Sequence, residues 1–220
     1  SNIRQPKTVV KKIEGLYYDD KFEHISLDSA VNCAYNVLRS GKEILIKPNL
    51  STMGMGIKFL SSASLSEIKN DFIRYGNFVV QEAVRQHSEM AYLNHDTVNT
   101  VRITTFLLND NVIPLAALVR VGAPEKRVDN WHQGGSIIGV NLDGSVLPWA
   151  LGNDIQKITQ LPSGALIGEN GFKRVPNFDK VVKLVKRAHY KVPMFKMISW
   201  DIAIEESGEP VMLEFNVYGD

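Results

Sequence analysis

Between residues 99 and 151 the sequence is a succession of strand-like segments joined by short turns, and this limits the possible fold more than any other feature. Residues 99–108 and 112–122 are rich in β-branched and apolar residues, and Asn-Asp-Asn at 109–111 is a typical hairpin turn between them. Residues 136–151 show the same pattern about Asp143-Gly144. Strands joined by such tight turns are antiparallel, so the region predicts an antiparallel sheet.

Helical patterns lie on both sides of this region. Residues 26–41 predict a helix that Ser26 caps and Gly41 ends, and residues 62–76 and 177–192 predict two more. Further strands are expected at 6–18, 44–47 and 77–84, and as a last hairpin at 197–220 about Ser207-Gly208. The apolar positions expected to face inward are, helix by helix, Ala30, Ala34, Val37 and Leu38; Leu65, Ile68, Phe72 and Ile73; and Phe178, Val181, Val182, Val185 and Ala188. Strand runs mixed with three helices predict an α+β fold.

The composition permits a normal core and excludes several classes of protein. Hydrophobic residues make up 44% and charged residues 22% of the 220, and the formal net charge is +1 without a long basic run, so nothing recommends nucleic acid as a partner. The single cysteine, Cys33, cannot form an internal disulfide, which fits the cytoplasm. The longest apolar stretch, 112–119, is far shorter than the roughly 20 residues that span a bilayer, so no membrane insertion is expected. The opening Ser-Asn is typical of a cloning scar, which suggests a fragment of a longer protein.

Three oxygen-bearing side chains are expected to converge at the last hairpin. Glu214 and Asn216 are two residues apart, so they share one face of a strand, and a turn about 207–208 brings Asp201 beside them. Such a set suits Mg²⁺, which prefers carboxylate and amide oxygens and keeps places for phosphate and water. The alternative is the exposed polar face of an edge strand. The apolar flanks favour the metal site, because carboxylates seldom lie in such runs without a partner.

A lysine stands at the end of a buried strand, directly before a loop with two glycines. Lys47 would be a fixed point charge for phosphate oxygens, and the backbone at Gly54 and Gly56 could aim N–H groups at an anion. We therefore expect residues 51–57 to form a mobile lid over a phosphate site. The signal is weak by itself, because there is no P-loop motif and a strand-ending lysine is usually only solvated.

The strand at 77–84 ends in a segment suited to a flat base. Backbone groups left free around Gln81, Glu82 and Val84 could hydrogen-bond the edge of the base, with apolar neighbours on its faces, and His87 lies one turn further. An ordinary passage from strand to loop is the alternative.

Two arginines lie within apolar strands and suit an anion. Arg102 would either point to solvent or direct its planar fork at a transferring phosphoryl group, and Arg120 on the next strand could cooperate. In the loop before the following strand, His132 and Gln133 could orient a substrate, although a surface-loop role is equally consistent with the sequence.

In their order along the chain these features resemble the ATP-grasp superfamily. More narrowly, "VVQEAVRQH", "NTVRITTFL", "NWHQGGSIIGVNLDGSV" and "WDIAIEESGEPVMLEFN" are similar to the sugar-transfer associated ATP-grasp group, which lies in bacterial polysaccharide loci. Some of its members carry the label hexapeptide transferase, but this chain has no hexapeptide repeat. The resemblance covers residues 8–216. It implies two α+β lobes that grip a nucleotide between antiparallel sheets: a smaller lid-bearing lobe at 8–83 and a larger magnesium-binding lobe at 84–220. The additional N-terminal domain that usually helps to bind the acceptor is not expected in this chain.

The resemblance also implies roles for individual residues. Lys47 would contact the ATP phosphates under a lid at Gly54 and Gly56, and Arg102 with Arg120 would stabilise the transferring phosphate. The adenine would meet the backbone of Gln81 and Val84, with Glu82 between them, and the ribose would lie near His87. The magnesium ligands would be Asp201, Glu214 and Asn216.

The activity implied is an ATP- and Mg²⁺-dependent ligase that joins a carboxylate to an amine through an acyl phosphate. Its partners would be small acceptors, sugar-linked ones among them, in the synthesis of bacterial cell-surface polysaccharide. Two alternatives stay open: a phosphotransferase that uses the same nucleotide cleft, and a non-catalytic ATP-binding module of a glycosyltransferase complex.

Overall fold

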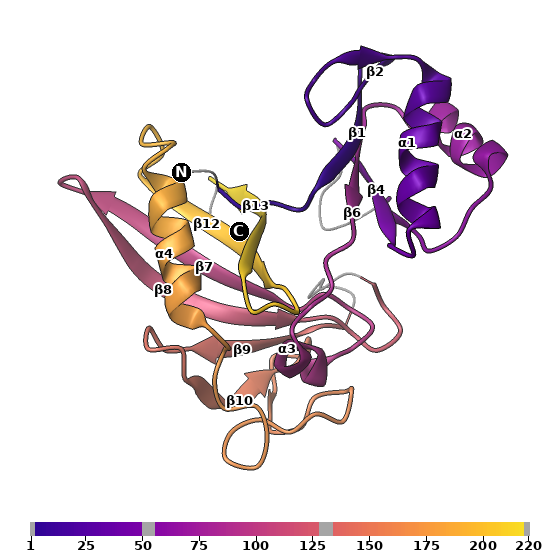
Figure 1. The fold of residues 1–220 in the computed structure, drawn as a ribbon. Coiled ribbons are helices and arrows are strands. Elements are labelled where there is room, and N and C mark those ends of the chain that lie inside the picture. The colour runs from indigo at the N-terminus through magenta and orange to yellow at the C-terminus, as the bar shows by residue number, and fades with distance from the viewer. Residues whose placement is uncertain (1–2, 50–55, 128–133, 218–220) are drawn as a thin grey trace. The chain divides into compact units, whose positions relative to one another are not determined.

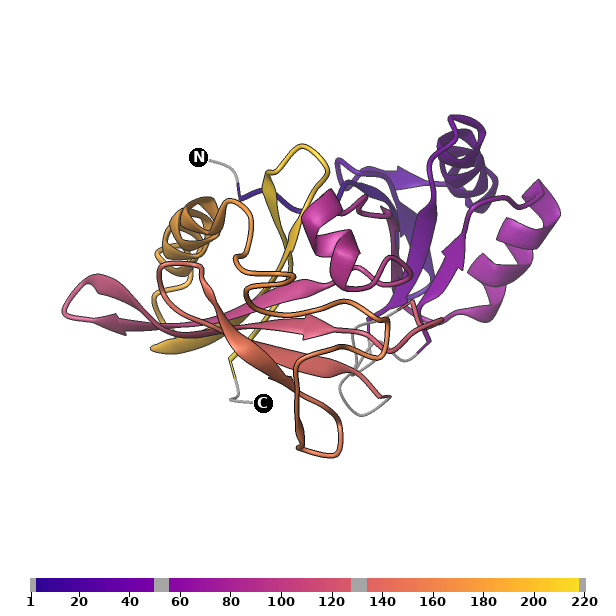
Figure 2. The same cartoon turned by 90° about the horizontal axis from the view of Figure 1, so that it is seen from below.

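The computed structural model describes residues 3–49, 56–127 and 134–217. The chain divides into two compact units, Pro6–Ala83 and Val84–Asp220, and the second also includes Ser1–Gln5. Figures 1 and 2 show them from two sides. None of the described helices is both long and apolar enough to cross a membrane.

The smaller unit is an antiparallel six-stranded sheet in the order β3-β2-β1-β6-β4-β5. Its strands are β1 (Thr8–Ile13), β2 (Leu16–Tyr18), β3 (His24–Ile25), β4 (Ile44–Pro48), β5 (Lys58–Leu60) and β6 (Phe78–Glu82). Helices α1 (Leu27–Arg39) and α2 (Leu65–Arg74) lie on the same side of it (Figure 1). Buried apolar residues of both helices and of the central strands form one core.

Helix α1 begins at its predicted cap, whereas α2 begins at Leu65, inside the predicted range 62–76, and one of its buried faces differs from the prediction. Ser26 caps α1, and Ser64 with Glu67 forms a capping box at the start of α2. On α2, Ile68 and Phe72 are buried as expected, whereas Leu65 and Ile73 are exposed and that part of the prediction is wrong. The face turned inward carries Asp71 in their place, and Lys58 of β5 pairs with its carboxylate at 2.7 Å. A pattern of apolar residues cannot reveal such a charged member of a buried face.

The larger unit is a seven-stranded antiparallel sheet in the order β11-β10-β9-β8-β7-β12-β13. Its strands are β7 (Thr100–Leu108), β8 (Asn111–Val121), β9 (Ser136–Val140), β10 (Val146–Leu151), β11 (Lys157–Ile158), β12 (Met197–Ile204) and β13 (Pro210–Asn216). The helices are α3 (Ser88–Leu93) and α4 (Phe178–His189). The predicted hairpin turn at 109–110 is confirmed: both residues have positive φ, 45° and 61°, as a tight primed turn requires. The antiparallel sheets and the α+β class are therefore as predicted.

One face of this sheet is covered by α4. Phe178, Val181, Val185 and Ala188 of the predicted inward set are buried, while Val182 is only partly buried. They pack against alternate residues of the strands, among them fully buried Val101, Ile103 and Ile198. We call this the core face, and the opposite one the open face.

The core face contains a polar chain that the sequence does not predict. His189 is fully buried at the end of α4. Trp200 Nε1 donates to Thr105 Oγ1 at 2.7 Å, Thr105 Oγ1 lies 2.7 Å from His189 Nδ1, and His189 Nε2 lies 2.8 Å from the Phe195 carbonyl oxygen. A carbonyl only accepts, so Nε2 carries a proton. These hydrogen bonds engage both ring nitrogens of His189 and hold the turn after α4.

Candidate functional site

A row of charged side chains crosses three neighbouring strands of the larger unit. Asp201 on β12 lies opposite Arg102 on β7 and also opposite Glu214 on β13. Directly opposed residues of antiparallel strands point to the same side, so the three share one face. Trp200, which precedes Asp201 on β12, points the other way into the core. The row therefore lies on the open face.

Asp201 is the buried centre of this row, with 3% of its surface exposed. Arg102 binds both carboxylate oxygens, from Nε to Oδ1 and from Nη2 to Oδ2, each at 2.8 Å. Arg120 on β8 adds a longer contact of 3.5 Å from Nη1 to Oδ2. Two guanidinium groups thus surround one carboxylate, and the fork of Arg102 matches it geometrically. We call Arg102, Arg120 and Asp201 the arginine–aspartate cluster.

A β-bulge decides which face Glu214 and Asn216 occupy. The pairing of β12 with β13 shifts by one residue just beyond the Asp201 pair, which makes Leu213 an extra residue on β13. Regular alternation would turn Glu214 to the core face. With the bulge, Glu214 lies opposite Asp201 and Asn216 lies opposite Ser199, both on the open face.

The predicted magnesium ligands therefore occupy neighbouring positions on one face. Their donors are carboxylate and amide oxygens, the type that Mg²⁺ prefers. Glu214 is exposed and Asn216 partly exposed, whereas both oxygens of Asp201 are engaged by arginine. Within the described ranges no group of three or more His, Cys, Asp and Glu side chains could hold a metal ion, and this trio has only two such members. The set fits a cation held chiefly by Glu214 and Asn216, with Asp201 shared with Arg102.

In the smaller unit, Lys47 is the next-to-last residue of β4, which lies between β6 and β5. Its side chain is partly buried. Gly56 has a φ of +76°, and a Cβ there would approach Pro48 Cγ to 3.3 Å, so its left-handed backbone requires glycine. Gly54 and the other residues at 50–55, which carry most of the predicted lid, lie outside the described residues. Of the predicted lid at 51–57, the structure therefore describes only residues 56 and 57.

The predicted adenine segment lies at the end of β6. Gln81 is inside the sheet, paired with Thr8 of β1 on one side and with Leu45 of β4 on the other. Val84 follows the strand, and among the described residues neither its N–H nor its C=O has a hydrogen-bond partner. Both backbone groups of Val84 are therefore available at this strand end.

Glu82, the last residue of β6, is held by two lysines. Lys42 Nζ lies 2.7 Å and Lys7 Nζ 3.2 Å from its carboxylate, and the Glu82 N–H donates to the Lys7 carbonyl at 2.9 Å. Burial by itself raises the pKa of the Glu82 carboxyl, but the hydrogen bonds and charges of Lys42 and Lys7 outweigh it and the pKa lies below its ordinary value. The carboxylate therefore ties the start of the unit to the end of β6.

The contacts of Glu82 with Lys7 and Lys42 should make the stability of the smaller unit sensitive to acid. The pKa of Glu82 has its ordinary value of 4.5 in the unfolded chain and a lower value in the folded chain. The stabilisation by these contacts is therefore complete above pH 4.5 and is lost as pH falls through the folded pKa. We expect Glu82→Gln to lower the free energy of unfolding by about 1 kcal/mol at neutral pH and to flatten its decline in acid. Urea denaturation followed by circular dichroism at a series of pH values measures both. Glu23→Gln, on an exposed turn, is the control, and an equal flattening there would contradict the assignment.

His87 has a structural role in addition to its predicted place near the ribose. Its Nδ1 accepts from the Glu89 N–H at 3.2 Å and so caps α3, while its own N–H donates to the Ile204 carbonyl at 2.8 Å. The short helix α3 is not predicted from the sequence. The ribose contact stays a prediction.

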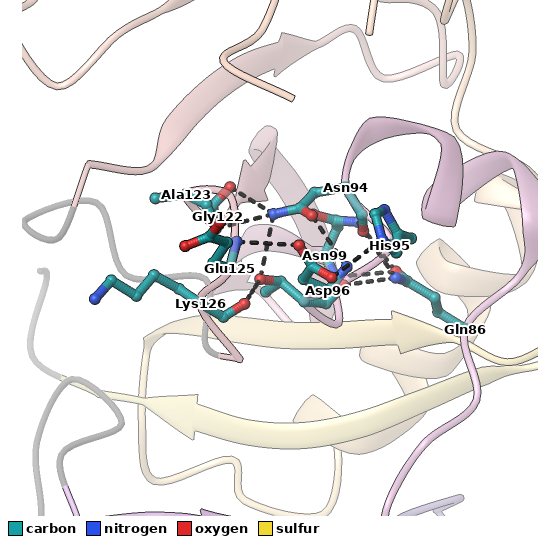
Figure 3. Close-up of polar contacts among 10 residues, drawn as sticks. Gln86, Asn94, His95, Asp96, Asn99, Gly122, Ala123, Glu125 and Lys126 are labelled. Carbon is teal, nitrogen blue, oxygen red and sulfur yellow. Dashed lines mark hydrogen bonds and ion pairs between the residues drawn. The ribbon is translucent and has the colours of Figure 1, made fainter. Parts of the chain in front are cut away.

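A buried amide network holds the loop that leads to the predicted substrate residues (Figure 3). Asn94 Nδ2 donates to the carbonyls of Gly122 and Ala123 at 2.9 and 3.1 Å, and Thr97 Oγ1 donates to the Lys126 carbonyl. The chain is thereby fixed up to residue 126. His132 and Gln133 themselves lie outside the described residues.

Gln86 and Asn99 complete this network from the other side. Gln86 Nε2 donates to the Asn94 carbonyl at 3.0 Å, and Asn99 Nδ2 donates to the carbonyls of Asn94 and Met90, each at 2.8 Å. Sequence reasoning missed these residues, because the run at 94–99 is typical of any polar loop. The partners of Asn94 are 28 and 29 positions away, which no local pattern reveals.

Comparison with known proteins assigns this chain to a family. The family model described as sugar-transfer associated ATP-grasp matches residues 3–218. The chain belongs to this family. The resemblance expected from the motifs is thus confirmed for the sugar-transfer associated ATP-grasp group. None of the curated proteins compared matches the sequence.

Solved structures show that this sugar-transfer associated ATP-grasp chain has the ATP-grasp fold. N5-carboxyaminoimidazole synthetase from Staphylococcus aureus, complexed with ADP, is 9% identical with a TM-score of 0.54, over 100% of this chain and 41% of that one. D-alanyl-alanine synthetase A from Vibrio cholerae is 8% identical with a TM-score of 0.53, over 97% and 50%. The ATP-grasp ligase PsnB, complexed with precursor peptide PsnA2 and AMPPNP, is 14% identical with a TM-score of 0.51, over 100% and 46%. The chain therefore spans less than two thirds of each of these proteins, and at such identities the likeness concerns the fold alone.

Proposed function

We propose that this chain carries the ATP- and Mg²⁺-dependent core of a ligase that joins a carboxylate to an amine through an acyl phosphate. The observation that carries the proposal is the arginine–aspartate cluster with Glu214 and Asn216 on the same open face, in a chain of the ATP-grasp family. The names synthetase and ligase among its structural neighbours support the reaction type. Its substrates would be small carboxylate and amine acceptors, sugar-linked ones among them, in the cytoplasmic stage of bacterial surface-polysaccharide synthesis.

The side chains would act mainly through charge. Bound Mg²⁺ would neutralise part of the charge on the ATP phosphates, with Glu214, Asn216 and Asp201 as its ligands. Arg102 would stabilise the transferring phosphoryl group, and its fork is already oriented by Asp201, so little reorganisation is needed. Lys47 of the smaller unit would meet phosphate oxygens.

This chemistry requires no nucleophilic side chain, and the single thiol is unsuited to be one. Burial raises the pKa of Cys33, and Asp19 and Asp20 raise it further, which disfavours the reactive thiolate.

For the nucleotide, we propose that the units at 6–83 and 84–220 correspond to the two lobes, and that Val84, with Gln81 and Glu82 before it, contacts adenine.

Product analysis tests the reaction. The purified chain, ATP and Mg²⁺ are incubated with sugar acids in the presence and absence of amino acids or amino sugars, and ADP release is followed. The ligase predicts ADP release that needs both substrates, an amide and free phosphate. A phosphorylated acceptor would instead establish the phosphotransferase alternative, and ATP binding without turnover would favour the regulatory module.

The metal assignment is tested by binding. We expect Glu214→Gln and Asn216→Ala each to weaken Mg-ATP binding by about tenfold or more, since even partners outside a metal's ligand shell are worth roughly 10–100-fold. Both residues lie near the end of an edge strand, so the fold should persist. Calorimetry with ATP, with and without Mg²⁺, measures the effect. Glu206→Gln, in the exposed turn between β12 and β13, is the matched control. Unchanged Mg-ATP affinity in both variants would exclude this metal site.

A further inference from the structure

The turn that follows α4 presents large apolar side chains among cations. Met194 has 69% of its surface exposed, Tyr190 52% and Phe195 37%. We define the basic apolar turn as Tyr190, Lys191, Met194, Phe195 and Lys196, all of which are exposed. Apolar side chains of this size gathered in one turn are uncommon on a surface that faces only water.

Positive charge accumulates at this end of α4. Toward its start, Lys180 pairs with Glu209 at 2.6 Å and Lys183 pairs with Asp179 at 3.1 Å. In the last turn Lys186 and Arg187 are exposed, and neither they nor the lysines of the basic apolar turn form an ion pair with any residue that the structure describes. Cations in the last turn complement the helix dipole, but the two lysines of the turn lie beyond the helix, where that effect has faded.

The basic apolar turn is held firmly in place. The Phe195 N–H donates to the Val192 carbonyl at 3.1 Å, and the Phe195 carbonyl is bound by buried His189. At its end, the Lys196 carbonyl accepts from the Leu107 N–H at 2.8 Å. The exposure of its side chains is therefore a property of the folded unit.

The tip of the β7–β8 hairpin lies beside this turn. Tyr190 Oη donates to the Asp110 carbonyl at 3.0 Å, and Leu108, at the same tip, is 49% exposed. Figure 1 shows the end of α4 and this hairpin tip at the same end of the larger unit. Asp110 contributes one exposed carboxylate, which leaves the surroundings predominantly basic.

We propose that the basic apolar turn is a contact site for an anionic lipid membrane surface. Lysines near such a surface attract its headgroups, and their long stems can lie along apolar material while Met194 and Phe195 enter the boundary between headgroups and acyl chains. An acidic protein would satisfy the charges, but it would need a pocket for two protruding side chains, whereas a lipid surface accepts both. The contact proposed is peripheral, with these two side chains alone entering that boundary. It involves the larger unit alone and is independent of the ligase reaction.

Vesicle sedimentation of the purified chain tests the proposal. We expect binding to vesicles of phosphatidylcholine with phosphatidylglycerol, little binding to phosphatidylcholine alone, and weakening by added salt. Lys191→Glu with Lys196→Glu should lower the partition coefficient about 20-fold or more, at about fivefold for each cation lost. Met194→Ser with Phe195→Ser should lower it as well, without changing the salt dependence.

The matched control is Lys157→Glu with Lys173→Glu. It makes the same change in net charge, but at the edge of the sheet that β11 forms, away from β12, into which the basic apolar turn leads. Lys157 lies on β11, and residue 173 adjoins β10. The control should bind as the unaltered chain does, with unchanged thermal unfolding in all variants. Equal loss in the control, or equal binding to both kinds of vesicle, would overturn the proposal. So would binding to polyglutamate with none to vesicles, which would indicate an acidic protein partner.

Discussion

Replacing Asp201 by asparagine should lower the free energy of unfolding of the larger unit by about 3 kcal/mol, because it leaves two guanidinium groups without the carboxylate between them. Breaking one side of a buried ion pair costs roughly 3–5 kcal/mol. The lower end applies here, since Arg102 and Arg120 each keep 17% of their side-chain surface exposed. All three tryptophans of the chain belong to this unit, so urea denaturation followed by their fluorescence reports on it.

Asp179→Asn is the control for this measurement. Asp179 also pairs with a cation, Lys183 at 3.1 Å, but both side chains are mostly exposed, so the change should be far smaller. An Asp201→Asn variant as stable as the control variant would show that the arginine–aspartate cluster contributes nothing to the fold. Asp201 would then be assigned to metal and phosphate chemistry alone.

Local sequence patterns predict the hairpins of this chain. The turn about 207–208 brings Asp201 close to Glu214, but the register beside the turn, with Ile204 opposite Pro210, would by itself place Leu213 opposite Asp201. The spacing of apolar residues along α4 likewise predicts most of its buried face, because helical periodicity is also a local property. What such patterns omit is a single inserted residue: Leu213 shifts the register of β13 and turns Glu214 and Asn216 to the open face. The sequence of an apolar run does not show where such a bulge occurs.

Contacts between distant segments are the part that the sequence does not reveal. Arg102 and Asp201 are predicted separately, one for phosphate and the other for metal, yet they bind each other across 99 positions. Their pairing depends on β7 lying beside β12, which tertiary packing decides. The same holds for His189, whose partner Thr105 is 84 positions away. Sequence reasoning thus identified residues that meet in the candidate site but not the ion pair that joins them.

Arg102 should matter more for turnover than for ATP binding. The charge on the transferring phosphoryl group shifts during the reaction, so a group that stabilises it acts mainly in the transition state. We expect Arg102→Ala to slow ADP formation roughly 10²–10³-fold, the usual cost of one charge-stabilising donor. Arg102→Lys keeps the charge but not the planar fork that now binds both oxygens of Asp201, so it should restore activity only in part.

The measurement is single-turnover ADP formation beside ATP affinity, at a temperature where the variant is folded. Until an acceptor is found, the slower ATPase side reaction serves. Arg120→Lys is the matched comparison, because its contact with Asp201 is longer, 3.5 Å, and comes from one nitrogen, so it should lose less. Turnover near that of the unaltered chain would exclude a catalytic role for Arg102. A loss confined to ATP affinity would place it in ground-state phosphate binding. A transition-state role requires that the folded Arg102→Ala variant still binds ATP but turns it over slowly. If instead its turnover fell only in proportion to the loss of folded protein, as expected for Asp201→Asn, Arg102 would be a structural partner of the Asp201 carboxylate.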